Sequence, residues 1–66
     1  MPVSMQAALG FGKLWKSTEE LQALTGLSYS EAIAAVRELQ KRGFKIAETY
    51  QSGDYLYAMA ERIVNV

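Results

Sequence analysis

The stretch from Ser17 to Phe44 constrains the fold of this chain more than any other part of it. Two segments within it each begin with a serine that is followed three residues later by a glutamate: Ser17 with Glu20, and Ser28 with Glu31. At this spacing the serine hydroxyl and the glutamate carboxylate can cap the free amides of a helix start reciprocally. We therefore expect two short helices, one after each serine.

A tight turn is expected between these helices, because Gly26 can take the left-handed conformation that ends a helix. In the second helix, apolar residues recur with the 3.6-residue period of one buried face. These residues are Ala32, Ala35, Val36 and Leu39. Lys41 and Arg42 complement the dipole at its end, and Gly43 supplies the C-terminal cap.

The segment before this helix pair is expected to support it. Val3 to Leu9 predicts a first short helix, with Ser4 as its N-cap and Gly10 near its end. Residues 11–16 alternate large apolar residues with glycine and lysine, which predicts an extended or irregular segment. We expect Trp15 to bury its ring in the core; stacking on a nucleic acid or a partner is the alternative.

The chain after the pair predicts a β-hairpin over residues 44–59. Residues 44–48 alternate apolar and polar side chains, residues 51–54 have the composition of a turn, and residues 55–59 are aromatic and aliphatic. Gly53-Asp54 is not the commonest two-residue turn, so we expect a loop of three to five residues. Tyr50, Tyr55 and Tyr57 are expected to fill the inner face of the sheet. Residues 61–66 could extend the last strand, form a short final element, or dock on a second copy.

Composition limits the function classes. The 66 residues fit one small domain, and seven Lys and Arg balance seven Asp and Glu. The chain has no cysteine and no histidine, which excludes disulfides and the usual zinc and copper ligand sets. We expect no cofactor and no enzymatic activity, because no nucleophile and base can be paired. The chain lacks an apolar run long enough to span a membrane and a basic signal start, so we expect a cytoplasmic protein.

The segment Leu21 to Ser30 resembles the helix-turn-helix of bacterial winged-helix regulators, with its Thr-Gly-Leu-Ser-x-Ser close to the isocitrate-lyase-regulator type. Residues 42–46, followed by 53–55, are similar to the wing of the biotin repressor's DNA-binding domain. The resemblance implies an α+β fold: a winged helix-turn-helix with three short helices, followed by a two- or three-stranded antiparallel β-hairpin wing. Residues 1–66 would form this single domain.

What the resemblance implies for function is sequence-specific binding of double-stranded DNA by a small transcriptional regulator, which could act as a homodimer. The helix of residues 28–42 would enter the major groove, with the hairpin 44–59 as wing. Arg37 is the candidate for a guanine contact, and two apolar residues could meet a thymine methyl group. The other candidates would contact phosphate or base. The full set is Ser28, Tyr29, Ser30, Ile33, Ala34, Arg37, Lys41, Lys45, Gln51 and Ser52.

A protein-protein interaction or dimerisation module is the alternative function. The zero net charge and the apolar Ile33 at the centre of the expected exposed face favour it, and Glu31 and Glu38 flank that face. Either this face or the C-terminal tail would then bind a protein partner. Ser28 is first of all a helix cap, and Arg37 could simply be solvated or pair with neighbours of Glu38, so the sequence leaves both functions open.

Overall fold

The computed structural model describes residues 3–10, 12 and 14–62. Its elements follow the order α1, β1, α2, α3, β2, β3. The helices are α1 (Met5–Leu9), α2 (Thr18–Thr25) and α3 (Tyr29–Lys41), and the strands are β1 (Lys16–Ser17), β2 (Phe44–Gln51) and β3 (Asp54–Arg62). The predicted α+β class, with three short helices and an antiparallel sheet, is confirmed.

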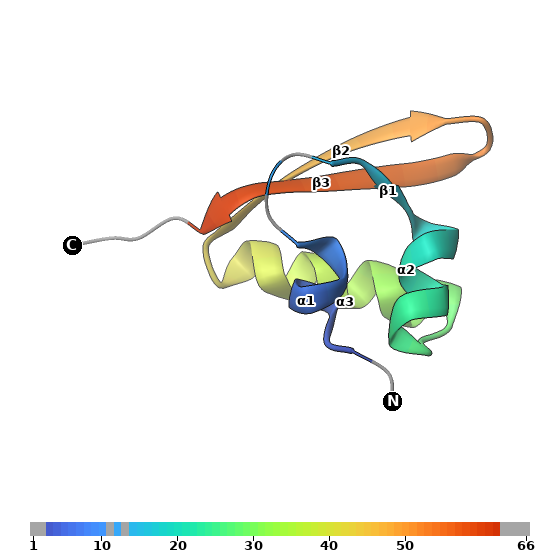
Figure 1. The fold of residues 1–66 in the computed structure, drawn as a ribbon, viewed down its shortest axis with the longest axis horizontal. Coiled ribbons are helices and arrows are strands. Elements are labelled where there is room, and N and C mark those ends of the chain that lie inside the picture. The colour runs from blue at the N-terminus through green and yellow to red at the C-terminus, as the bar shows by residue number, and fades with distance from the viewer. Residues whose placement is uncertain (1–2, 11, 13, 63–66) are drawn as a thin grey trace.

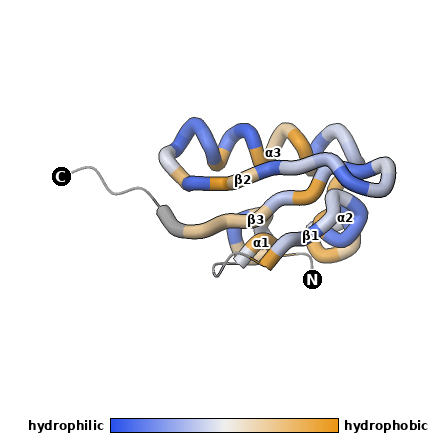
Figure 2. Tube along the Cα trace, turned by 90° about the horizontal axis from the view of Figure 1, so that it is seen from above, coloured by the Kyte–Doolittle hydropathy of each residue, from blue (hydrophilic) through white to orange (hydrophobic). Residues whose placement is uncertain are grey.

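The sheet has three strands in the order β1-β3-β2, so β3 lies in the middle. Both pairings are antiparallel, and the β2-β3 pairing extends from Phe44 opposite Arg62 to Gln51 opposite Asp54. The three helices lie together on one side of this sheet (Figure 1). Viewed from above, α3 lies along β2, and hydrophilic ends flank its hydrophobic centre (Figure 2).

The helices begin, and α2 also ends, at capping residues that the sequence predicts. Ser17 and Ser28 are N-caps with complete capping boxes to Glu20 and Glu31. Ser4 caps α1 by accepting a hydrogen bond from the Ala7 amide. Gly26 ends α2 in the left-handed conformation, at φ 75°. These predictions are confirmed because each depends on residues only three or four positions apart.

The core forms where α1, α2 and α3 meet the inner face of the hairpin. The predicted apolar stripe of α3 lies in it: Ala32, Val36 and Leu39 are buried, and Ala35 packs against the cluster. The other buried members are Met5, Ala8, Leu9, Leu21, Phe44, Ile46, Tyr57 and Met59. One hydrophobic face of the sheet is thus covered by helices, as an amphipathic sheet requires.

The hairpin turn is shorter than expected. Two residues, Ser52 and Gly53, connect the strands, and both have positive φ, 54° and 81°. Positive φ at both positions is the geometry of the type I′ turn, whose twist matches that of the flanking strands. The prediction of a three-to-five-residue loop is wrong because Asp54 belongs to β3 and not to the turn.

The aromatic residues are less buried than expected. The side chain of Trp15 is 48% exposed, so the prediction of a core ring is wrong, and Leu14 beside it is 70% exposed. Of the three tyrosines assigned to the inner face, Tyr57 is fully buried, whereas Tyr50 and Tyr55 are exposed. Their rings form an edge-to-face pair next to the hairpin turn.

β3 runs to Arg62, and the alternatives for residues 63–66 lie outside the described residues. Within the part of the chain that the structure describes, no helix has the length and apolar character needed to cross a membrane.

Candidate nucleic-acid interface

The surface that the sequence predicts for DNA is carried by α3 and the hairpin tip. α3 begins at the capped turn after α2, and Ser28 uses its hydroxyl oxygen to accept a hydrogen bond from the Glu31 amide at 3.3 Å. Glu31 accepts in return from the Ser28 amide at 2.9 Å, and this bond lowers the pKa of the Glu31 carboxyl. Ser28 is therefore a capping residue in this structure, and its side chain is exposed.

The structure divides the expected exposed side of α3 into two surfaces. Tyr29, Arg37 and Gln40 each bond to a residue of the hairpin, so one surface is turned toward β2 and β3. Ile33 lies on this surface, one helical turn from both Tyr29 and Arg37, and it is half-buried. The prediction that Ile33 is exposed is wrong, because the helix presents this surface to the hairpin.

The second surface of α3 faces away from both the core and the hairpin. Ser30, Ala34 and Lys41 recur there with helical spacing, and all three are exposed. Arg37 borders it with a side chain that is 48% exposed. A hydroxyl, a methyl group and two cations thus share this outward surface.

Tyr29 is held against the hairpin by a carboxylate. Its hydroxyl donates to Oδ1 of Asp54 at 2.8 Å, and the amides of Glu19 and Tyr55 donate to the same carboxylate at 3.2 and 2.7 Å. Partial desolvation raises the pKa of Asp54, but these hydrogen bonds outweigh it and the pKa lies below its ordinary value. The hydrogen bond to Asp54 raises the pKa of the Tyr29 hydroxyl. One side chain therefore connects the starts of α2, α3 and β3.

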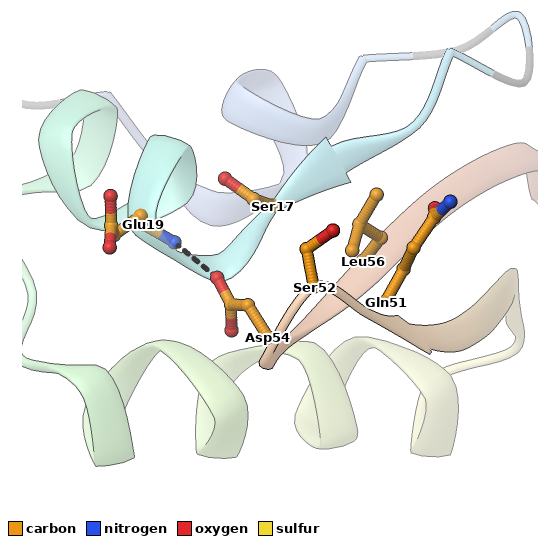
Figure 3. Close-up of a pocket in the computed structure, with 6 residues that line it drawn as sticks. All are labelled: Ser17, Glu19, Gln51, Ser52, Asp54 and Leu56. Carbon is orange, nitrogen blue, oxygen red and sulfur yellow. Dashed lines mark hydrogen bonds between the residues drawn. The ribbon is translucent and has the colours of Figure 1, made fainter.

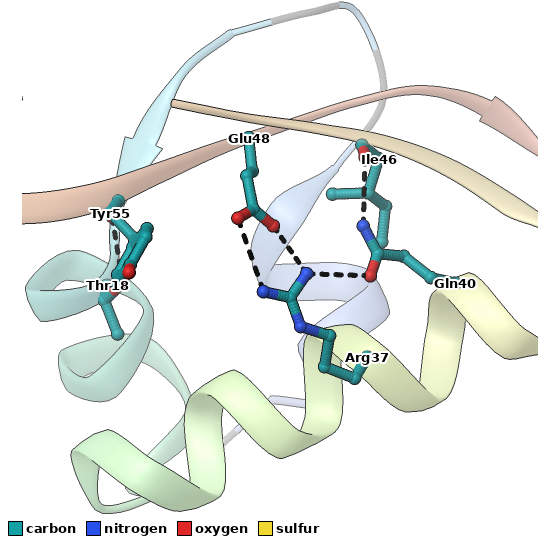
Figure 4. Close-up of polar contacts among 6 residues, drawn as sticks. All are labelled: Thr18, Arg37, Gln40, Ile46, Glu48 and Tyr55. Carbon is teal, nitrogen blue, oxygen red and sulfur yellow. Dashed lines mark hydrogen bonds and ion pairs between the residues drawn. The ribbon is translucent and has the colours of Figure 1, made fainter. Parts of the chain in front are cut away.

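Arg37 forms an ion pair with Glu48 that is not expected from the sequence. Its Nη1 and Nη2 donate to the two carboxylate oxygens of Glu48 on β2, at 2.5 and 3.3 Å (Figure 4). Nη1 also donates to Gln40, whose amide nitrogen in turn donates to the Ile46 carbonyl. The hydrogen bond from Arg37 lowers the pKa of Glu48, and that from Glu48 raises the pKa of Arg37.

The strand candidates lie on different faces of the hairpin. Lys45 is exposed between the buried residues Phe44 and Ile46, so it points to the outer face of the sheet, away from the residues that meet α3. Gln51 and Ser52 are exposed at the tip. The structure therefore does not bring Lys45 onto the surface that carries Lys41.

A shallow hollow of about 270 Å³ lies at the hairpin tip (Figure 3). The side chains of Gln51, Ser52 and Leu56 rise from the hairpin on the side of Ser17, and Asp54 points toward the Glu19 amide (Figure 3). The hollow's ionisable side chains, Glu19 and Asp54, are both acidic, so phosphate would be repelled there. No group of three potential metal ligands is found among the described residues.

Three residues that bond to the candidate surface are not among those expected from the sequence: Gln40, Glu48 and Asp54. The sequence does indicate which way Glu48 points, because the period-two alternation of a strand puts it on the same face as the buried Ile46. Gln40 follows Arg37 by three positions on α3, the spacing of neighbours on a helix surface. Nothing local indicates that Asp54 meets Tyr29, since the two are far apart in the chain.

No protein-family model, no curated protein and no solved structure matches this chain.

Proposed function

We propose that this chain is a winged-helix domain that binds double-stranded DNA in a sequence-specific manner and acts as a small transcriptional regulator. In this proposal α3 enters the major groove and the β2-β3 hairpin is the wing. The element order supports it, with a helix pair joined by a tight turn and followed by a two-stranded ribbon. The central position of β3 between β1 and β2 fits a wing anchored on the body of the domain.

The observation that carries the proposal is the outward surface of α3. Lys41 lies on it and Arg37 borders it, whereas Glu38 forms an ion pair with Arg42 at 3.7 Å. The chain is neutral overall, so its attraction to DNA depends on this local arrangement of cations and not on a basic surplus. Ser30 and Ala34 have small, exposed side chains, so base edges could approach the centre of this surface closely.

Titration of a labelled random-sequence duplex pool, read by fluorescence anisotropy, tests the proposal. Binding should be strongest at low salt and weaken as salt rises, because phosphate contacts release counterions. Lys41→Ala should lower the affinity for all sequences alike and reduce the salt slope by about one. Arg42→Ala is the matched control, since Arg42 pairs with Glu38 and lies beside α1 residues. Absence of binding at low salt would contradict the proposal.

Two copies are expected on one DNA site, since a single module of this size buries only about 600–1,000 Å² of its surface on DNA. Sedimentation of the protein with and without duplex DNA measures this directly. A complex that holds one chain per duplex at saturation would contradict the dimer while leaving DNA binding intact.

A protein-interaction function is the second candidate, and the exposure of Leu14 and Trp15 favours it. Adjacent exposed apolar side chains are typical of contact sites. Leu14→Ser with Trp15→Ser should then abolish self-association or partner binding and leave DNA titration unchanged. The half-buried Ile33 gives this function less support than the sequence suggests.

A further inference from the structure

The guanidinium of Arg37 is only partly used by the protein. Arginine has five N–H donors in a rigid planar fork, and three of them are engaged here. Nη1 donates to Glu48 and to Gln40, and Nη2 donates to the second oxygen of Glu48. The carboxylate of Glu48 therefore pairs with the end of the guanidinium, where it accepts hydrogen bonds from one N–H of Nη1 and one N–H of Nη2.

Among the described residues, none accepts a hydrogen bond from the other two donors, the Nε–H and the second N–H of Nη2. These two donors run parallel along the side edge of the guanidinium. Guanine presents two adjacent acceptors in the major groove, O6 and N7, whereas adenine pairs one acceptor with one donor. This edge of Arg37, to which no residue in the described part of the chain bonds, thus matches guanine and mismatches adenine.

The orientation of this edge is fixed from β2. Glu48 is a strand residue, and Gln40 is itself held by the Ile46 carbonyl at 3.1 Å (Figure 4). The bond to Glu48 on β2 and the bond to Gln40, which β2 holds in place, restrict the rotamers of the Arg37 side chain before any ligand binds. A side chain ordered in advance loses less entropy when it binds.

We propose that Glu48 and Gln40 present Arg37 to DNA as a pre-oriented guanine reader, which makes Glu48 a residue that determines specificity. This inference rests on the proposed DNA-binding function and adds the base that α3 selects. Glu48 has two effects of opposite sign. Its charge repels phosphate and weakens binding to any duplex, while its hydrogen bonds sharpen discrimination between bases.

The two effects can be separated with a matched pair of variants. Glu48→Ala and Glu38→Ala remove the same charge from exposed positions, but Glu38 has no bond to Arg37. Both variants should bind random-sequence DNA more tightly than the wild type, because each removes one negative charge. Loss of base discrimination should be confined to Glu48→Ala.

The experiment uses duplexes selected from a random pool by the wild-type protein. The selected guanines are replaced one at a time by 7-deazaguanine, which lacks the N7 acceptor. At one position per half-site the wild type should lose affinity by about tenfold, the size expected of a bidentate base contact. Arg37→Ala should be insensitive to this replacement, Glu48→Ala should lose most of the sensitivity, and Glu38→Ala should keep it. Circular dichroism verifies that each variant is folded.

The outcomes separate the two proposals. Failure of the wild type to bind any duplex at low salt would overturn both. Binding without dependence on a guanine N7 would overturn only the guanine reader. Equal discrimination by Glu48→Ala and Glu38→Ala would do the same, because Glu48 would then act through its charge alone.

Discussion

The hydroxyl of Tyr29, at the first residue of α3, donates a 2.8 Å hydrogen bond to Asp54, at the first residue of β3. The two residues are 25 positions apart in the chain. Their bond fixes the hairpin tip beside the start of α3, and the Thr18 hydroxyl adds a second tie by donating to the Tyr55 carbonyl at 2.8 Å. The hairpin tip is therefore tied to the helices by side chains that lie far apart in the chain.

Tyr29→Phe should loosen the hairpin tip. Removing the hydroxyl deletes a hydrogen bond to a charged carboxylate, and solvent screening keeps the loss of overall stability small because the pair is exposed. Hydrogen exchange at the tip amides of residues 52–55 should accelerate more than exchange in α3. Tyr50→Phe is the matched control, since Tyr50 is 62% exposed. Equal acceleration in both variants would show that the bond to Asp54 does not hold the tip.

Acid should destabilise the domain through Asp54, Glu48 and Glu31. The folded state lowers the pKa of each carboxyl, so each stabilises the fold above its unfolded pKa and loses that contribution as pH falls through the folded pKa. The melting temperature should therefore drop below about pH 4, the range of unperturbed carboxyls. Asp54→Asn should melt lower at neutral pH and show a shallower acid dependence. An unchanged acid dependence in that variant would contradict a role for this carboxyl.

Tyr57→Phe should stabilise the protein. Tyr57 is fully buried, and none of the described residues forms a hydrogen bond with its hydroxyl. Burial also raises the pKa of this hydroxyl. Phenylalanine keeps the ring and removes the unpaired group, so the free energy of unfolding should rise by about 1 kcal/mol. Tyr57→Ala is the opposite control, with an expected loss of about 3–5 kcal/mol from the cavity. Denaturant unfolding measures both, and a destabilised Tyr57→Phe would contradict the prediction.

Gly26→Ala should weaken the junction between α2 and α3. Gly26 has φ 75°, a left-handed conformation that costs a residue with a Cβ about 1–2 kcal/mol. Gly26→Asn should cost less, because asparagine tolerates this conformation. Thermal unfolding of the two variants should rank them in that order. The reverse ranking would show that steric contact, and not backbone conformation, requires glycine here.

The exposed aromatic residues show where sequence reasoning reaches its limit. Trp15 and Tyr50 have large aromatic side chains of the kind that usually fill a core, yet both are exposed. Tyr50 lies opposite Tyr55, next to the hairpin turn. Whether an apolar residue is buried depends on which other element packs over it. The local sequence around the residue does not show which element that is.

The sequence by itself determined the local structure of this protein: three capped helices, the Gly26 turn, the apolar stripe of α3 and the existence of a hairpin. Each is specified by residues within a few positions of one another, through capping and periodicity. The tertiary structure alone decided that Arg37 meets Glu48, that Tyr29 meets Asp54, and that Ile33 is half-buried on the side of α3 turned toward the hairpin. These contacts arise because packing sets the hairpin beside α3, and such long-range placement depends on the whole core rather than on any local pattern.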